Sequence, residues 1–249
     1  MLPPAAEVLL LSAAAFGAGV LNAIAGGGSF LTFPALVYAG VPPIQANATS
    51  ALAVSPGYLG STLGFRAELA ELPRSRLLRE SLIAAAGGLV GAGLLLVTPG
   101  RLFSGLVPWL LLFATVLFAL GPWLQRTLGA GQDLARWREP GLLAVAVYGG
   151  YFNGGLGILL MALYLLSGES RLDRVNALKN LASLVLSLLS VLAFVAAGAI
   201  AWRQGLLMMV AATLGGWAGA RVARRLPASS VRGLVIATGL GMTALFFAR

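Results

Sequence analysis

The stretch Gly19-Val-Leu-Asn22-Ala-Ile-Ala-Gly26-Gly27-Gly28-Ser29-Phe-Leu-Thr-Phe-Pro34 decides the fold, because three consecutive glycines interrupt a long apolar segment. In hydrocarbon, a backbone N–H or C=O outside a helix is costly unless protein, water or a ligand satisfies it. The break therefore predicts the lining of a cavity. Gly28 and Ser29 can begin a half-helix whose N–H groups and positive dipole end favour an anion. Close helix packing through the glycines is the alternative interpretation.

A second break, Gly149-Gly150-Tyr-Phe-Asn153-Gly154-Gly155-Leu-Gly157, has the same pattern. Asn22 falls on Asn153, which lies 131 residues later in the chain. In the segments that follow the two breaks, Ser50 falls on Lys179. Broken apolar segments at corresponding places in two halves indicate the binding site of a secondary transporter. The chain is therefore interpreted as a duplication.

The composition is that of an integral membrane protein. Of 249 residues, 59% are hydrophobic and 10% are charged, and the mean hydropathy is +0.90. The net charge of +9 does not indicate nucleic acid, because most arginines lie in short loops between apolar runs, as membrane topology requires. The chain has no Cys and no His, which removes thiolate sites and the commonest metal ligand. We therefore expect no metal and no cofactor.

The apolar runs predict two repeats joined by a loop, since a run of about 20 residues spans a bilayer. The first repeat is expected at 1–125, with a broken helix at 7–40 and spans at 44–65, 77–98 and 102–120. A connecting loop follows at 126–139. The second repeat is expected at 140–249, with a broken helix at 141–167 and spans at 172–200, 203–221 and 229–248. The predicted fold class is all-α integral membrane.

Two topologies are open, and the arginines distinguish them. If both broken helices are full spans, the chain has eight spans in two parallel repeats, with nine arginines on one side and seven on the other. If both are re-entrant hairpins, each repeat adds three spans, the repeats are inverted, and the division is thirteen to three. The excess of positive charge on cytoplasmic loops favours the hairpins, with the termini extracytoplasmic.

Lys179 is the only lysine, and it lies about 10 Å along the helix that starts near Leu172. All eight acidic residues lie at segment ends or in loops, which argues against a cation substrate. Lys179 could extend to the interface near Asp173, as lysines in membrane helices often do. A polar stripe at helical spacing instead favours a cation that neutralises an anionic substrate. The stripe consists of Asn176, Lys179, Asn180, Ser183, Ser187 and Ser190.

Five motifs together carry a family resemblance: Asn22-Ala-Ile-Ala-Gly26-Gly27-Gly28-Ser29-Phe, Phe33-Pro34-Ala-Leu, Asn47-Ala-Thr49-Ser50, Gly154-Gly155-Leu-Gly157 and Asn176-Ala-Leu-Lys179-Asn180. In this combination the chain resembles the sulfite exporter TauE/SafE family of membrane permeases over nearly its whole length. The resemblance implies passive or secondary transport of sulfur-containing anions, such as sulfite or organosulfonates, across a bacterial-type plasma membrane.

We therefore expect a secondary anion transporter of the plasma (inner) membrane, with export the expected direction and alternating access between two inverted repeats. An anion channel is the nearest alternative, and a membrane enzyme or scaffold is a more distant one. The expected partners are a small anionic substrate and membrane lipid, without nucleic acid, and a homodimer is left open. No catalytic residue is expected. The candidate substrate-binding residues are Asn22, Gly26, Gly27, Gly28, Ser29, Asn47, Thr49, Ser50, Asn153, Gly154, Gly155, Asn176, Lys179 and Asn180.

Overall fold

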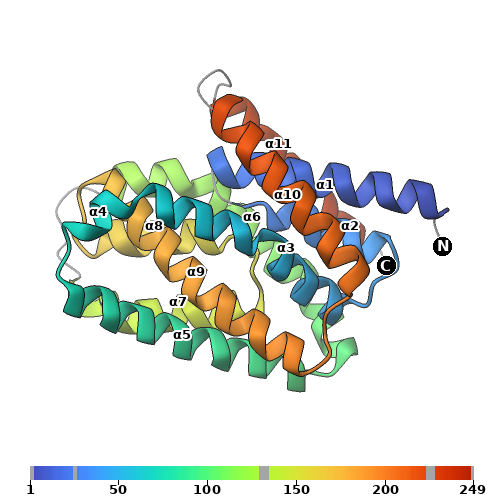
Figure 1. The fold of residues 1–249 in the computed structure, drawn as a ribbon, viewed down its shortest axis with the longest axis horizontal. Helices are drawn as coiled ribbons and strands as arrows, with labels where there is room; N and C mark the ends of the chain where they lie inside the picture. The colour runs from blue at the N-terminus through green and yellow to red at the C-terminus, as the bar shows by residue number, and fades with distance from the viewer. Residues whose placement is uncertain (1–2, 25–26, 129–134, 223–227, 248–249) are drawn as a thin grey trace.

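The computed structural model describes residues 3–24, 27–128, 135–222 and 228–247, and every regular element in these ranges is a helix (Figure 1). Within these ranges, four helical segments are long and apolar enough to cross a membrane: Pro4–Asn22, Arg74–Val97, Gly100–Leu117 and Leu172–Ala196. Ser29–Tyr38 and Leu156–Leu166 are shorter apolar helices. The prediction of an all-α integral membrane protein is thereby confirmed.

The helices follow in two series. The first is α1 (Pro4–Ile24), α2 (Ser29–Tyr38), α3 (Pro43–Gly64), α4 (Arg66–Ala70), α5 (Arg74–Val97) and α6 (Gly100–Leu128). A short 3-10 helix, η1 (Ala135–Trp137), precedes the second. The second is α7 (Arg138–Tyr151), α8 (Leu156–Leu166), α9 (Leu172–Ala196), α10 (Trp202–Val222) and α11 (Ala228–Phe247). Both glycine breaks therefore separate two helices.

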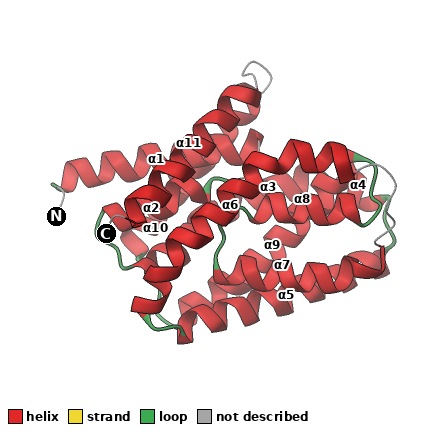
Figure 2. Cartoon of the chain, turned by 180° about the vertical axis from the view of Figure 1, so that it is seen from behind, coloured by secondary structure: helices red, strands yellow, loops and turns green. Residues whose placement is uncertain are grey.

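At each break the chain turns back on itself and forms a helical hairpin. The first hairpin is α1 and α2, and the second is α7 and α8. Figures 1 and 2 place the start of α1, the end of α2 and the end of α11 at one end of the molecule. The start of α7 and the end of α8 lie at the opposite end, beside α4. The two hairpins thus enter from opposite ends, and their tips approach in the middle, where the rings of Phe33 and Phe152 are 5.5 Å apart.

Gly27 and Gly155 make the two turns possible. Their φ angles are 130° and 75°, a region that residues with a side chain rarely adopt. Gly155 also lies directly against α6, because a β-carbon built on it would be 2.9 Å from the Cβ of Ala114. Each tip therefore requires glycine for its backbone conformation.

Each hairpin packs closely on a helix of the other series, α1 along α10 and α7 along α5. A β-carbon on Gly19 would overlap the carbonyl oxygen of Ala212, and one on Gly150 would overlap the carbonyl oxygen of Gly88. Two of the glycines near the breaks thus serve close helix packing, as the alternative interpretation held for such motifs. The division into repeats and the orientation in the membrane remain predictions.

Ion pairs join the two series at the end that carries α4. The Glu80 carboxylate on α5 is only 3% exposed, accepts hydrogen bonds from Arg76 Nε (2.9 Å) and the Tyr164 hydroxyl (3.0 Å), and pairs with Arg138 (3.2 Å). Buried charge is stable only when it is paired in this way. The cluster therefore fastens α5 to both helices of the second hairpin.

A second ionic contact at this end involves Glu71, which directly follows α4. Its carboxylate accepts hydrogen bonds from Arg171 (2.7 Å) and Arg174 (2.8 Å) at the start of α9. The bond from Arg174, followed by the bond from Arg171, lowers the pKa of the Glu71 carboxyl below its ordinary value. This contact ties the segment after α3 to α9.

Candidate functional site

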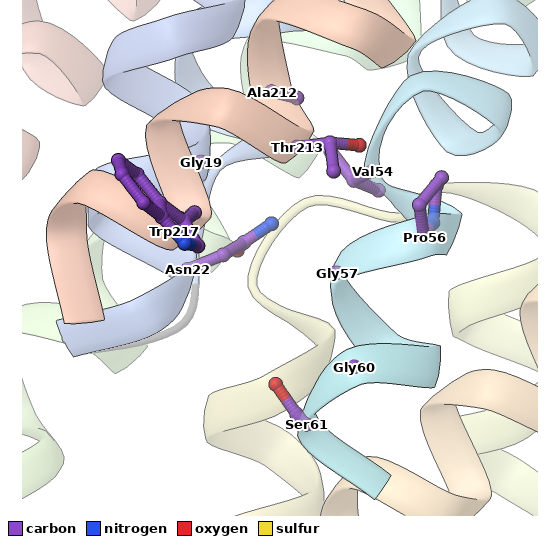
Figure 3. A pocket seen from close by; sticks show the side chains of 11 residues that line it. Gly19, Asn22, Val54, Pro56, Gly57, Gly60, Ser61, Ala212, Thr213 and Trp217 are labelled. Carbon is purple, nitrogen blue, oxygen red and sulfur yellow. The ribbon is translucent and has the colours of Figure 1, made fainter. Parts of the chain in front are cut away.

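The first hairpin tip is closed by Asn22. Its side-chain Oδ1 accepts hydrogen bonds from the backbone N–H groups of Gly28 (2.8 Å) and Gly27 (3.0 Å). These are donors that the start of α2 leaves without helical partners. Asn22 Oδ1 is therefore occupied, and the amide nitrogen of the same side chain is the polar group left to face outward. Figure 3 shows this nitrogen directed from the end of α1 toward α3.

Asn153 occupies the corresponding place at the second tip and is 4% exposed. Its Oδ1 accepts a hydrogen bond from the Tyr58 hydroxyl of α3 at 3.5 Å. Its Nδ2 is buried without a hydrogen-bond partner in the part of the chain that the structure describes. Beside it, the carbonyl oxygen of Gly154 accepts a bond from the Tyr148 hydroxyl (2.8 Å). In both asparagines the side-chain oxygen thus accepts hydrogen bonds within the protein, and the amide nitrogen is left to donate to another group.

Lys179 lies on α9 between the two tips and is 9% exposed. It lines a small cavity of about 20 Å³, which is room for roughly one water molecule. Both tips contribute to this cavity, Gly27 from the first hairpin and Gly157 from the start of α8. The complete lining is Asn22, Gly27, Gly57, Tyr58, Ser61, Gly157, Lys179, Asn180 and Ser183. We call this space the Lys179 cavity.

Lys179 places an amino group in this cavity without a counter-charge from the described residues. Within the described residues, no carboxylate forms an ion pair with Lys179, and Asp173 is exposed rather than paired with it. The Ser183 hydroxyl, one turn further along α9, is 1% exposed and has no hydrogen-bond partner in the same part of the chain. A buried ammonium beside an unsatisfied hydroxyl is costly, and a bound anion would offset that cost.

A larger cleft of about 380 Å³ adjoins the Lys179 cavity (Figure 3). It lies between the end of α1, the second half of α3 and the second half of α10. Asn22, Gly57 and Ser61 line both spaces. The remaining lining is Gly19, Val54, Pro56, Gly60, Ala212, Thr213, Gly216 and Trp217. We call this space the α3–α10 cleft.

The sequence model of the sulfite exporter TauE/SafE family matches residues 11–246 of this chain. The chain belongs to this family. Three relatives of this chain are each named as a probable membrane transporter protein. One from Sinorhizobium sp. (ORF9) is 27% identical over 93% of this chain and 89% of its own length. One from Haemophilus influenzae is 28% identical over 94% and 92%, and one from Escherichia coli K12 (YfcA) is 26% identical over 91% and 84%. No solved structure matches the chain.

The TauE/SafE chain is accordingly a multi-pass membrane transporter. TauE/SafE is a family of permeases and not of enzymes, which confirms the prediction that the protein is not an enzyme.

Three candidates on α3 bond to neighbouring helices and do not line the Lys179 cavity. Asn47 Nδ2 donates to the carbonyl oxygen of Tyr151 (3.1 Å) at the end of α7. Thr49 Oγ1 accepts from the N–H of Ala201 (3.0 Å), just before α10 begins. The hydroxyls of Ser50 and Thr32 lie 2.6 Å apart and join α3 to α2. These contacts hold α3 in place against both hairpins and α10.

The structure places the other candidates as follows. Ser29 is buried in the first turn of α2, and Asn180 lines the Lys179 cavity beside Lys179. Asn176 is half-buried one turn earlier on α9 and does not line that cavity. Gly26 lies outside the described residues.

Tyr58, Ser61 and Ser183 line the Lys179 cavity but were not among the candidates. Ser183 is part of the polar stripe on α9, so the helical period already pointed to it. Positions 54, 57 and 61 continue the same face of α3 from Ser50, and this period could have found Ser61. Tyr58 has no comparable signal, because its partner Asn153 is 95 residues away in the chain.

Proposed function

We propose that this transporter carries sulfur-containing oxyanions, such as sulfite or organosulfonates, and binds them in the Lys179 cavity. The observation that carries the proposal is a buried lysine without a counter-charge among the described residues, in a space that both hairpin tips line. The name of the family supports the sulfur-containing class of substrate. An anion bound there would supply the charge that Lys179 lacks.

Hydrogen-bond donors around the cavity suit the oxygens of such an anion. The amide nitrogen of Asn22, which lines the cavity, remains available because the side-chain oxygen already accepts bonds within the protein. Asn153 does not line the cavity, but it bonds to Tyr58, which does. Ser183 adds a buried hydroxyl without a partner in the described chain. A bound oxyanion would satisfy these groups, and each buried donor left unsatisfied costs about 1–3 kcal/mol.

The arrangement of the hairpins supports alternating access. The two hairpins approach the Lys179 cavity from opposite ends of the molecule (Figures 1 and 2). Binding sites at the meeting point of broken helices are typical of secondary transporters with inverted repeats. We propose that two inverted repeats exchange conformations around the cavity and export the anion across the plasma membrane. Export would start from the end that carries α4, which we call the arginine-rich end because Arg66, Arg74 and Arg138 begin helices there, and which we expect to be cytoplasmic. Membrane lipid as a partner and a possible homodimer remain predictions.

Reconstitution into liposomes tests this function. Purified protein is inserted into vesicles, and uptake of labelled sulfite, methanesulfonate, sulfoacetate, taurine, sulfate and acetate is measured against protein-free vesicles. We expect saturable uptake of sulfite or a sulfonate, and faster uptake into vesicles preloaded with the same unlabelled anion, as a carrier requires. Flux that does not saturate and shows no exchange would indicate the anion channel instead. Uptake of none of the sulfur-containing anions would refute the proposed substrate class.

A further inference from the structure

The α3–α10 cleft and the Lys179 cavity are neighbours with a shared wall. Asn22, Gly57 and Ser61 line both. The cleft holds about 380 Å³, whereas the cavity holds about 20 Å³. An anion of several heavy atoms therefore fits the cleft as it stands, but it fits the cavity only after these shared residues move apart.

The cleft leads away from the end where the chain begins. On α3 its lining runs from Val54 to Ser61, toward α4, and on α10 it runs from Ala212 to Trp217. Both helices start at the end that holds the start of α1, as Figure 1 shows. The cleft therefore occupies their later halves, and along α3 it extends from mid-depth toward the end that carries α4.

Gly57 and Gly60 leave open space in the wall of the cleft. A β-carbon built on either glycine would meet no atom within 4 Å, so neither one is needed for helix packing. Glycine inside a helix is less favourable than alanine. Gly19, in contrast, is in backbone contact with α10. The open glycines on α3 thus lack a packing role, and what they provide is an unobstructed cleft.

We propose that the α3–α10 cleft is the route by which the substrate anion passes between the arginine-rich end and the Lys179 cavity, and that Gly57 and Gly60 keep this route open. The inference rests on the proposed function, since it concerns the same substrate. Among the described residues, no carboxylate lines the cleft, and its polar side chains are Asn22, Ser61, Thr213 and the indole of Trp217. An anion can therefore pass without meeting a repelling charge.

A matched pair of substitutions on α3 tests the route. Gly60 and Gly64 are both exposed, and a β-carbon on either would meet no atom within 4 Å, but only Gly60 lines the cleft. Gly60→Leu should lower the initial rate of sulfite or methanesulfonate uptake at least tenfold, while Gly64→Leu keeps the wild-type rate. Both variants should keep a melting temperature near that of the wild type. A wild-type rate in Gly60→Leu, or an equal loss in Gly64→Leu, would overturn the route.

The same assay separates this inference from the proposed function. If the wild-type protein transports none of the sulfur-containing anions, the proposed function fails. If the wild type transports one of them and Gly60→Leu does so equally well, only the route fails.

Thiol labelling tests what occupies the cleft, because the natural chain contains no cysteine. Ser61→Cys is treated with a membrane-impermeant maleimide applied from the arginine-rich side. We expect rapid labelling that sulfite or methanesulfonate slows, with no such effect for Gly64→Cys. Slow labelling of Ser61→Cys that the anions leave unchanged would indicate that a lipid acyl chain fills the cleft, and this result would overturn the route.

Discussion

Asn22 caps Gly28 across the turn of the first hairpin, with 2.8 Å between Asn22 Oδ1 and the backbone nitrogen of Gly28. The donors at this tip therefore bond within the protein instead of pointing into the cavity. What the tip presents is the amide nitrogen of Asn22, which lines both the Lys179 cavity and the α3–α10 cleft. One side chain thus closes the hairpin and also faces the proposed substrate.

Substitutions of Asn22 should separate these two roles. Asn22→Asp keeps an oxygen for the N–H groups of Gly27 and Gly28, and its negative charge lies at the start of α2, where it is favourable. We expect a melting temperature near that of the wild type and loss of anion binding, because a carboxylate replaces the donor. Asn22→Ala should lose both functions and cost about 1 kcal/mol of stability. Anion binding that survives in Asn22→Asp would contradict the role of the Asn22 amide as a donor to the anion.

The Glu80 cluster should contribute strongly to stability. Glu80→Gln removes the carboxylate that pairs with Arg138 and leaves Arg76 only its longer contact with Glu169 (3.4 Å), so we expect a loss of about 2–4 kcal/mol, seen as a lower melting temperature. Glu139→Gln is the control, since its pair with Arg79 is exposed and should contribute less than about 1 kcal/mol. Equal melting temperatures for the two variants would show that the buried cluster stabilises the fold no more than the exposed pair does.

Glu71 should make stability depend on pH in the acid range only. Its pKa is lower in the folded protein, so the ionic contact with Arg171 and Arg174 stabilises the fold above the carboxyl's ordinary pKa of 4.5. This stabilisation is lost as the pH falls through the lowered folded pKa. The melting temperature of the wild type should exceed that of Glu71→Gln at pH 7, and the difference should vanish in acid. A difference that grows on acidification would show that folding raises, rather than lowers, the pKa of Glu71.

The sequence could predict the features that depend on local signals. Three glycines in an apolar run indicate a break, and Gly27 and Gly155 have the positive φ angles that such a turn needs. Lys179 stood out as the only lysine of the chain, in a polar stripe with helical spacing. The all-α fold followed from the composition and from apolar runs of about 20 residues. In each case the signal lies within a few residues of the feature that it predicts.

Contacts between distant segments could not be predicted in the same way. Thr49 bonds to Ala201, 152 residues away, and this geometry exists only once α3 and α10 have packed. The position of Gly28 is a similar case. A β-carbon there would lie 2.6 Å from the carbonyl oxygen of Ala18, so Gly28→Ala disturbs packing in addition to any effect on the anion. That substitution does not isolate a binding role, whereas a change at Lys179 does.

The most direct test of the anion site is the melting temperature of wild type and Lys179→Met, each with and without sulfite or methanesulfonate. Methionine is close to lysine in length and carries no charge. Replacing an uncompensated buried charge by an apolar side chain is neutral or stabilising, so without anion the variant should melt at or above the wild-type temperature. The anion should raise the melting temperature of the wild type by mass action. Lys179→Met should lose this rise, because its affinity falls about tenfold or more with the loss of a charged hydrogen bond. An undiminished rise in Lys179→Met would contradict the assignment of Lys179 to the anion site.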